Sequence, residues 1–404
     1  MGIRPIFSAL LRNRAGAILV ALQIAITLAI VVNAIYLTQQ RVSKIGRPSG
    51  IDDQNIFAFW VNTYQKDYDF LGMVRADMSL LRQMPDIIDV TPMQQVPLSG
   101  SGNSSGFYSL PDKKGETSPA NTFSVDEHGA KTLGITLSAG RDFEANDVVY
   151  KKEDQREPGY PPVVIISQGF AQALFKDTPA LGKNLYDDQS RPMRIIGVIS
   201  HMQGSWVGWD KVDRTMLYPQ VGPYPSTQYV IRTKPGSMDQ VMAAVEVALR
   251  KRDSDRVIAT PMTKMSDMKR RSYASDSLMS VTLSTVTGLV LVFSSLGIFG
   301  LATFNVNSRT RQIGTRRAVG ARKTDVVQYF LAENWIVTSV GVGVGCCLAL
   351  AAGFWLSTQY QLPRLDLYYL VGGVLGLWAL GQLAAWQPAL RAAKVSPAMA
   401  TRNI

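Results

Sequence analysis

Four long stretches of this chain carry no charged residue and consist mostly of apolar side chains. They cover residues 15–40, 277–308, 334–363 and 367–390. An apolar run of about 20 residues is long enough for a helix to cross the hydrocarbon core of a bilayer. A fifth uncharged run, 90–111, is rich in Pro, Gly, Ser and Gln, whose polar groups could not be satisfied in lipid. The pattern predicts four transmembrane helices and a soluble segment at 90–111.

The long segment between the first two apolar runs, residues 41–271, alternates between strand and helix patterns. We expect strands at 55–61, 163–166 and 193–200, and helices at 70–84, 168–175 and 237–251. Interspersed elements of this kind are typical of a mixed α+β domain, and about 230 residues are enough for a separate core. Residues 262–279 are expected to form a stalk helix that continues into the second transmembrane helix.

The apolar runs and the segments between them predict nine successive parts of the chain. The chain begins with a cytoplasmic interfacial helix (1–14), transmembrane helix 1 (15–40) and a large extracytoplasmic domain with its stalk (41–271). It continues with the stalk end and transmembrane helix 2 (272–307), a cytoplasmic loop (308–325), transmembrane helix 3 (326–358), a short outer loop (359–366), transmembrane helix 4 (367–390) and a cytoplasmic tail (391–404). Val32-Asn33-Ala34 also fits a signal-peptide cleavage site, but the apolar run exceeds a usual signal-peptide core, which favours an uncleaved anchor.

The distribution of charge predicts the orientation of the chain. It carries 42 Lys and Arg against 31 Asp and Glu, a net charge of +11. With both termini in the cytoplasm, that side holds 12 basic residues and one acidic residue, Asp325, which leaves 30 of each sign elsewhere. Short loops rich in Lys and Arg stay on the cytoplasmic side. The basic excess is therefore expected to face anionic membrane lipid, and a nucleic-acid partner is not expected.

The most basic short segment is Ser308–Asp325, which reads SRTRQIGTRRAVGARKTD and lies between two apolar runs. Its six basic residues are Arg309, Arg311, Arg316, Arg317, Arg322 and Lys323. We interpret it as a cytoplasmic helix on which another protein acts; the alternative is a loop that serves topology alone. Glu333 is expected at the membrane interface, paired with an arginine of this segment, because a carboxylate at the bilayer centre costs about 2.5 to 3.5 kcal/mol. A proton-relay role for Glu333 is the less favoured alternative.

Signatures of catalysis and cofactor binding are missing from the sequence. It contains no G-x-x-x-x-G-K-[ST] phosphate loop and no H-E-x-x-H motif. The only histidines, His128 and His201, are far apart, and the only cysteines, Cys346 and Cys347, are neighbours, for which disulfide geometry is rare. We therefore expect that the chain is not an enzyme and holds no metal or cofactor.

Two glycine pairs at GxxxG spacing lie inside the third and fourth apolar runs. They are Gly341 with Gly345 and Gly372 with Gly376. This spacing lets helix backbones approach closely. It predicts helix packing and leaves open whether the partner helix belongs to the same chain or to a second copy.

The Ser308–Asp325 segment, followed by Phe330-Leu331 and Glu333, resembles the signature of ABC permeases of the macrolide-exporter type, the MacB/FtsX superfamily. That signature reads approximately R-x-x-E-I-G-x-x-R-A-x-G-A. The matching residues here are Arg309, Ile313, Gly314, Arg317, Ala318, Gly320 and Ala321, with Gln312 in place of the Glu. Residues 388–393 and 396–397 are similar to the family's ending, and 134–135, 139–143, 180–183 and 195–198 are similar to its periplasmic core domain.

The resemblance implies a stand-alone permease of a bacterial inner-membrane ABC transporter, with four transmembrane helices and a MacB-like periplasmic core. It implies a dimer with a second permease copy or a paralogous permease, and ATP hydrolysis by a separate ABC ATPase subunit. Ser308–Asp325 would be the coupling helix that docks on this ATPase, with Glu333 as the partner of the loop. The coupling residues implied are Arg309, Arg311, Gln312, Ile313, Gly314, Arg316, Arg317, Ala318, Gly320 and Ala321.

The resemblance also implies that ATP-driven motion is transmitted to the periplasmic domain. Efflux with a periplasmic adaptor and an outer-membrane channel is the leading interpretation. The alternatives are an FtsX-like regulator of a cell-wall hydrolase and a permease that extracts lipoproteins. The length of 41–271 makes the hydrolase regulator less favoured, since the family members that regulate hydrolases have smaller outer domains.

Overall fold

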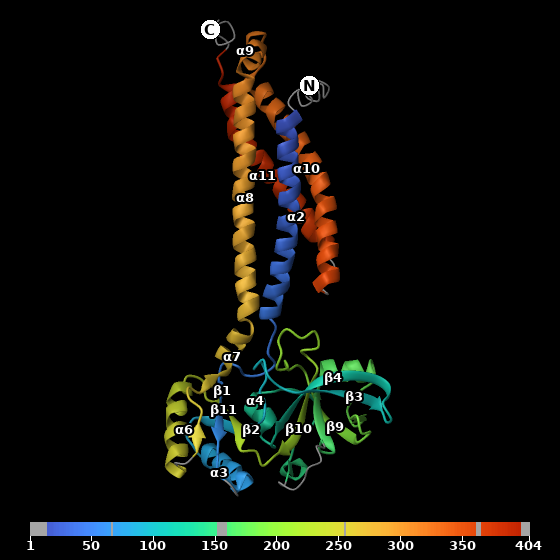
Figure 1. Ribbon diagram of the computed structural model, residues 1–404, viewed down its shortest axis with the longest axis vertical. Coiled ribbons are helices and arrows are strands. Elements are labelled where there is room, and N and C mark those ends of the chain that lie inside the picture. The colour runs from blue at the N-terminus through green and yellow to red at the C-terminus, as the bar shows by residue number, and fades with distance from the viewer. Residues whose placement is uncertain (1–13, 66–67, 152–159, 254–255, 361–364, 397–404) are drawn as a thin grey trace. The chain divides into compact units, whose positions relative to one another are not determined.

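The computed structural model of the chain describes residues 14–65, 68–151, 160–253, 256–360 and 365–396. It divides into two compact units (Figure 1). The helical unit consists of Met1–Gly46 and Asp276–Ile404, and the globular unit is Arg47–Ser275. The predicted interfacial helix, except Arg14, and the end of the cytoplasmic tail lie outside the described residues.

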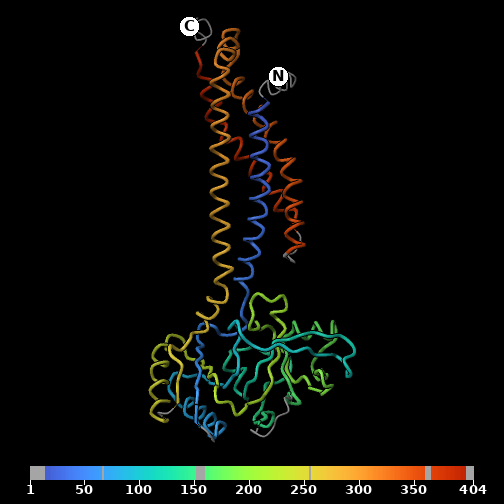
Figure 2. Tube along the Cα trace, in the orientation of Figure 1, coloured from blue at the N-terminus to red at the C-terminus, as the bar shows by residue number. Residues whose placement is uncertain are grey.

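In its described residues the helical unit has five helices, which can be followed along the tube in Figure 2. They are α2 (Arg14–Ile45), α8 (Ala274–Ser308), α9 (Thr310–Ala318), α10 (Lys323–Tyr360) and α11 (Leu367–Ala393). All except α9 are long and apolar enough to cross a membrane, which confirms the four predicted helices. Helices α2, α8 and α11 extend at most five residues beyond their uncharged runs, whereas α10 begins 11 residues before its run, in the polar segment that starts at Lys323.

Close packing in the helical unit depends on glycine. A Cβ added to Gly341 would lie 2.7 Å from the carbonyl oxygen of Ala21, and one added to Gly345 would lie 3.0 Å from Ala25. These two glycines therefore let α10 approach α2 within the same chain. Around Gly376, by contrast, a Cβ would meet nothing within 4 Å. The first GxxxG pair is thus an intrachain contact, whereas Gly376 lies at an open surface of the helical unit.

Polar side chains connect α2 with α8. The hydroxyl oxygens of Thr27 and Ser294 are 2.8 Å apart and buried, and the Gln23 amide donates to the Phe293 carbonyl at 3.3 Å. Near the other end of α2, Arg41 forms an ion pair with Asp276. Much of the remaining surface of α8 is apolar and exposed, as expected for a helix that faces lipid or another apolar surface.

The globular unit contains two sheets. The first has the order β12-β1-β11-β2 with β13 paired to β1, and all its strand pairs are antiparallel. Its strands are β1 (Ile56–Asn62), β2 (Ile87–Met93), β11 (Ser226–Thr233), β12 (Val257–Ile258) and β13 (Thr263–Lys264). Alternation along β1 places Phe57, Phe59 and Val61 in a core with α3 (Phe70–Arg82) and α6 (Met238–Arg252). Ala58 and Trp60 point to the opposite face.

The second sheet closes on itself. Its order is β4-β3-β8-β9-β7-β10-β6, β5 pairs with β9, and a parallel pairing of β10 with β4 completes the circuit. The strands are β3 (Ser104–Leu110), β4 (Lys114–Val125), β5 (Leu137–Gly140), β6 (Val149–Tyr150), β7 (Val163–Ser167), β8 (Asn184–Tyr186), β9 (Pro192–Ile199) and β10 (Thr215–Val221). Short helices α4 (Gly129–Leu133), η1 (Ala145–Asp147) and α5 (Gln168–Phe175) complete the unit, and Phe170 of α5 is fully buried in its core. The predicted α+β architecture is confirmed.

The continuous stalk helix expected at 262–279 is wrong. Thr263–Lys264 form strand β13, helix α7 covers only Met265–Ser272, and the chain leaves helical geometry at Tyr273 before α8 begins. Tyr273 is buried, and its hydroxyl donates to Gln203 Oε1 at 2.8 Å. This tertiary hydrogen bond holds the end of α7 in the globular unit and explains why the two helices are separate.

Candidate functional site

The basic segment forms helix α9 followed by a tight turn. Arg309 is the N-cap of α9, which ends at Ala318, and the turn contains Gly320 with a φ of +105°, a conformation that favours glycine. The Asp325 carboxylate then accepts from the backbone N–H of Arg322 at 2.9 Å and caps the start of α10. The single predicted helix is therefore a short helix, a turn and the first residues of α10.

One face of α9 is anchored inside the helical unit. Ile313 is buried in a small cluster that contains Val306, Val326, Ala392 and Ala393, which belong to α8, α10 and α11. Arg317 donates to the Val395 carbonyl at 2.6 Å. Contacts with three long helices therefore hold α9 in place.

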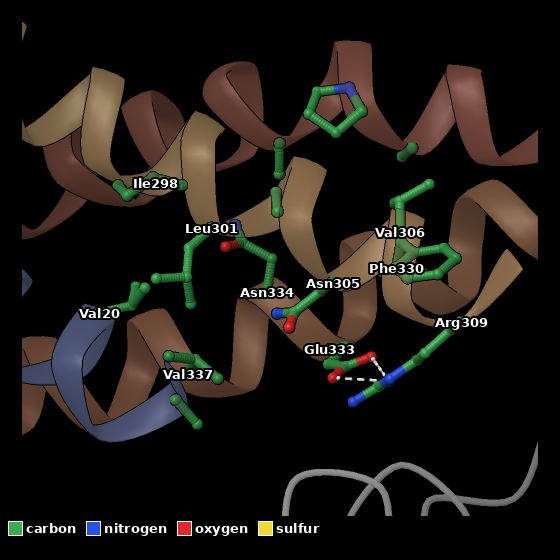
Figure 3. A pocket seen from close by; sticks show the side chains of 15 residues that line it. Val20, Ile298, Leu301, Asn305, Val306, Arg309, Phe330, Glu333, Asn334 and Val337 are labelled. Atoms are coloured by element: carbon green, nitrogen blue, oxygen red, sulfur yellow. Dashed lines mark hydrogen bonds and ion pairs between the residues drawn. The ribbon is translucent and has the colours of Figure 1, made fainter. Parts of the chain in front are cut away.

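Arg309 and Glu333 form an ion pair on the anchored side of α9. The guanidinium Nη1 lies 2.9 and 3.0 Å from the two carboxylate oxygens, and Glu333 is only 6% exposed. Figure 3 shows the two side chains pointing toward each other at the edge of a cavity of about 50 Å³. Such a cavity holds a few water molecules at most. Glu333 therefore ties α10 to the start of α9.

Cations and small side chains occupy the opposite face of α9 and its turn. Among the residues singled out from the sequence, the exposed ones are Arg311, Gln312, Arg316, Ala318 and Gly320, while Ala321 is half-buried and Gly314 is buried. Arg316 covers the ring of Tyr329 with its guanidinium carbon 4.7 Å from the ring centre. The structure thus brings together an exposed basic surface, but it separates Arg309 and Arg317, which face inward.

Val319 is a residue of this surface that the sequence reasoning missed. Its side chain is 84% exposed at the turn between α9 and α10. A valine next to glycine, in a short turn flanked on both sides by basic residues, is the signal that could have identified it. An exposed apolar residue surrounded by cations is a suitable contact for a protein partner.

The described part of the chain contains no group of three His, Cys, Asp or Glu side chains that could hold a metal ion. His128 lies 3.0 Å from Asp89, and His201 contacts the Pro48 carbonyl at 2.8 Å. Each histidine is therefore explained by a local polar contact.

Comparisons with known proteins match two families along the chain. The MacB-like periplasmic core domain matches residues 17–248, more than half of the chain, and the FtsX-like permease C-terminal family matches residues 284–397. The second match includes α9 and the turn after it.

Several individual proteins are similar to this chain. The macrolide export ATP-binding/permease protein MacB of Neisseria meningitidis is 26% identical over 287 residues, which cover 69% of this chain and 42% of that protein. The uncharacterized ABC transporter permease YknZ of Bacillus subtilis is 24% identical over 299 residues, 71% of each chain. The crystal structure of the periplasmic region of MacB from Actinobacillus actinomycetemcomitans has a TM-score of 0.33 and 17% identity, covering 57% of this chain and 97% of that one.

This chain spans less than half the length of the Neisseria MacB relative. The match over residues 17–248 covers α2 and most of the globular unit, and the second match covers most of the helical unit that follows. The chain therefore belongs to the MacB-like periplasmic core domain family and, with its FtsX-like permease C-terminal region, is an ABC permease of the MacB/FtsX type.

Proposed function

We propose that this chain is the permease subunit of an ABC transporter whose ATPase is a separate protein, and that α9 docks on that ATPase. The observation that carries the proposal is the two-sided character of α9. Its inner face is fixed to α8, α10 and α11, and its outer face presents cations around the exposed Val319. A force applied to the outer face would therefore reach the long helices directly.

The partner surface that fits α9 combines acidic groups with a small apolar recess. Arg311, Arg322 and Lys323 are exposed and would meet the carboxylates. Val319 would enter the recess and lose most of its contact with water. Gln312 carries no charge, so this position would contribute a hydrogen bond to the interface where a glutamate would contribute a charge.

The same proposal assigns the orientation of the chain. The basic α9 segment would lie in the cytoplasm with both termini, near anionic lipid, and the globular unit would lie in the periplasm. A second permease copy or a paralogous permease would complete the membrane part. Motion of the globular unit would then serve efflux through a periplasmic adaptor and an outer-membrane channel.

Affinity co-purification in mild detergent tests the docking surface. The tagged full chain, purified from cells that contain its native partners, is compared with Arg311→Glu/Arg322→Glu, and bound proteins are identified by mass spectrometry. Arg391→Glu is the matched control, because it reverses another exposed arginine of the helical unit outside α9. We expect an ABC ATPase with the wild type and the control and at least tenfold less with the double variant.

Two results would contradict the proposal: absence of an ATPase from the wild-type sample, or equal recovery with the double variant. The other recovered proteins test the transport role. A periplasmic adaptor supports efflux, whereas a cell-wall hydrolase or a lipoprotein in its place supports one of the two alternatives.

A further inference from the structure

A cleft of about 510 Å³ lies in the globular unit. Its floor is the face of the first sheet opposite to α3 and α6, where Trp60 of β1 stands directly across from Gln228 of β11. One wall is the segment 94–103 between β2 and β3, and the other includes Thr263 and Met268. Such a volume is in the range of small-molecule sites.

The lining of this cleft mixes polar and apolar side chains and is uncharged. Among the residues that the structure describes, it includes four side-chain amides, from Gln94, Gln95, Asn103 and Gln228, and no Asp, Glu, Lys, Arg or His. Charged residues make up 18% of the chain, so a site of this size would ordinarily include two or three. A ligand of either sign would find no counter-charge here.

Two of the amides have no hydrogen-bonding partner in the described part of the chain, yet their polar atoms remain accessible from the cleft. Gln95 is 9% exposed and Gln228 is 6% exposed, and within the described part of the chain neither side-chain amide makes a hydrogen bond, although both line the cleft. Buried polar groups in proteins are almost always paired, with protein, water or a ligand. Because protein supplies no partner for these two amides, water or a ligand in the cleft must supply it.

The wall passes close to Ser205 and Gln95 at Gly102. A Cβ at Gly102 would lie 2.5 Å from Ser205 Oγ and 3.3 Å from Gln95 Oε1. A larger residue at position 102 would require the Ser205 side chain to shift. The cleft thus has a pair of unpartnered amides, one in the wall and one in the floor.

The chemistry of these groups matches a carbohydrate. An amide both donates and accepts, as each hydroxyl of a sugar does. The half-buried Trp60 ring provides an apolar face against which the C–H face of a sugar ring can pack. An extended peptide could not join the sheet at this floor, because β1 and β11 are paired along both edges. We propose that this cleft binds an uncharged oligosaccharide, independently of any docking at α9.

Glycan-array binding of the full chain in detergent tests the proposal, with chitopentaose and maltopentaose as soluble neutral probes in calorimetry and oligogalacturonate as the anionic probe. The variants are Gln228→Leu and Trp60→Ala. Gln240→Leu is the matched control, because Gln240 is exposed on α6, across the sheet from the cleft. We expect a neutral glycan to bind the wild type and the control, and at least tenfold weaker binding by both cleft variants.

Thermal unfolding separates a binding role from a structural one. Gln228→Leu removes an amide that makes no hydrogen bond within the described part of the protein, so we expect its unfolding temperature to stay equal to that of the wild type or to rise while binding is lost. Absence of neutral-glycan binding, binding of anionic glycans alone, or equal binding by Gln228→Leu would each overturn the proposal.

Discussion

The globular and helical units bury their polar groups in different ways. In the globular unit, buried Asp77 accepts from the buried Arg256 at 2.5 Å and from Tyr229 at 2.8 Å. In the helical unit, the buried contacts between the middles of long helices are between neutral groups, such as the hydroxyls of Thr27 and Ser294. Its described ion pairs involve Asp276, in the first turn of α8, and Arg309, just after its last residue.

This difference follows from the solvent around each unit. A charge network in a water-soluble domain needs only good partners, whereas a charge at the centre of a bilayer is expensive even when paired. Close backbone approach at Gly341 and Gly345 takes the place of ionic contacts in the helical unit. We therefore expect the globular unit to be most sensitive to lost charge and the helical unit to added volume.

The largest expected effect is in the globular unit. Arg256→Met leaves Asp77 buried without its main partner, and removal of one member of a buried pair costs about 3 to 5 kcal/mol. In hydrogen exchange of the full chain, amides of β1 and β11 should lose at least a hundredfold in protection, while α2 and α10 should not change. Arg256→Met/Asp77→Asn is the control, because Asn keeps an acceptor for Tyr229 and removes the charge. A double variant no more stable than Arg256→Met would contradict this account.

An intermediate effect is expected from added volume in the helical unit. Gly341→Leu places a side chain against the Ala21 backbone, and overpacking of this kind costs about 1 to 3 kcal/mol. Gly376→Leu meets open space and should change stability by less than about 0.5 kcal/mol. Thermal denaturation in detergent, followed by far-UV circular dichroism, measures both. Equal unfolding temperatures for the two variants would show that α2 and α10 are not closely packed.

The smallest expected effect is a pH dependence confined to the globular unit. The hydrogen bond between His128 and Asp89 raises the pKa of the imidazole above its ordinary value of 6.5. Burial opposes ionisation of Asp89, but hydrogen bonds from His128 and Lys131 outweigh it and lower the pKa of the carboxyl to about 2. The contribution of protonated His128 to folding stability is fully present below the pKa of the imidazole in the unfolded chain. It is lost as the pH rises through the higher pKa of the folded state.

Hydrogen exchange at pH 6 and pH 8 measures this contribution, once intrinsic exchange rates are corrected for. We expect the unfolding free energy of the globular unit to be lower at pH 8 than at pH 6 by less than about 1 kcal/mol, since the imidazole is partly exposed. His128→Gln should abolish that difference. If His128→Gln shows the same stability difference between pH 6 and pH 8 as the wild type, another titratable group causes that difference.

Local patterns explain which parts of the fold could be predicted. Helix α5 has the predicted bounds because Ser167 caps it and apolar residues follow at helical spacing. The four membrane helices can be predicted equally well, since their signal is a long uncharged run. The break at Tyr273 cannot be predicted from local sequence, because it depends on Gln203, 70 residues earlier in the chain.

Tertiary placement explains what could not be predicted of the two sites. The sequence identified the basic segment around α9, but it could not tell that Arg317 faces inward to Val395 while Arg311 faces outward. The partner of Gly341 was equally hidden, since a GxxxG pattern does not name the opposing helix. Gln95 and Gln228 meet at one cleft only because β11 pairs with both β1 and β2.

Two of the polar contacts between α2 and α8, Arg41 with Asp276 and Thr27 with Ser294, also define the rotational angle between these helices. Asp276 and Ser294 of α8 are 18 residues apart, which is five turns at about 3.6 residues per turn, so both lie on one line along the helix. Inserting one residue between them would rotate one contact by about 100° relative to the other, whereas inserting seven would nearly restore the angle and lengthen the helix by about 10 Å. Helix α8 can therefore meet α2 at both contacts in one angular setting only.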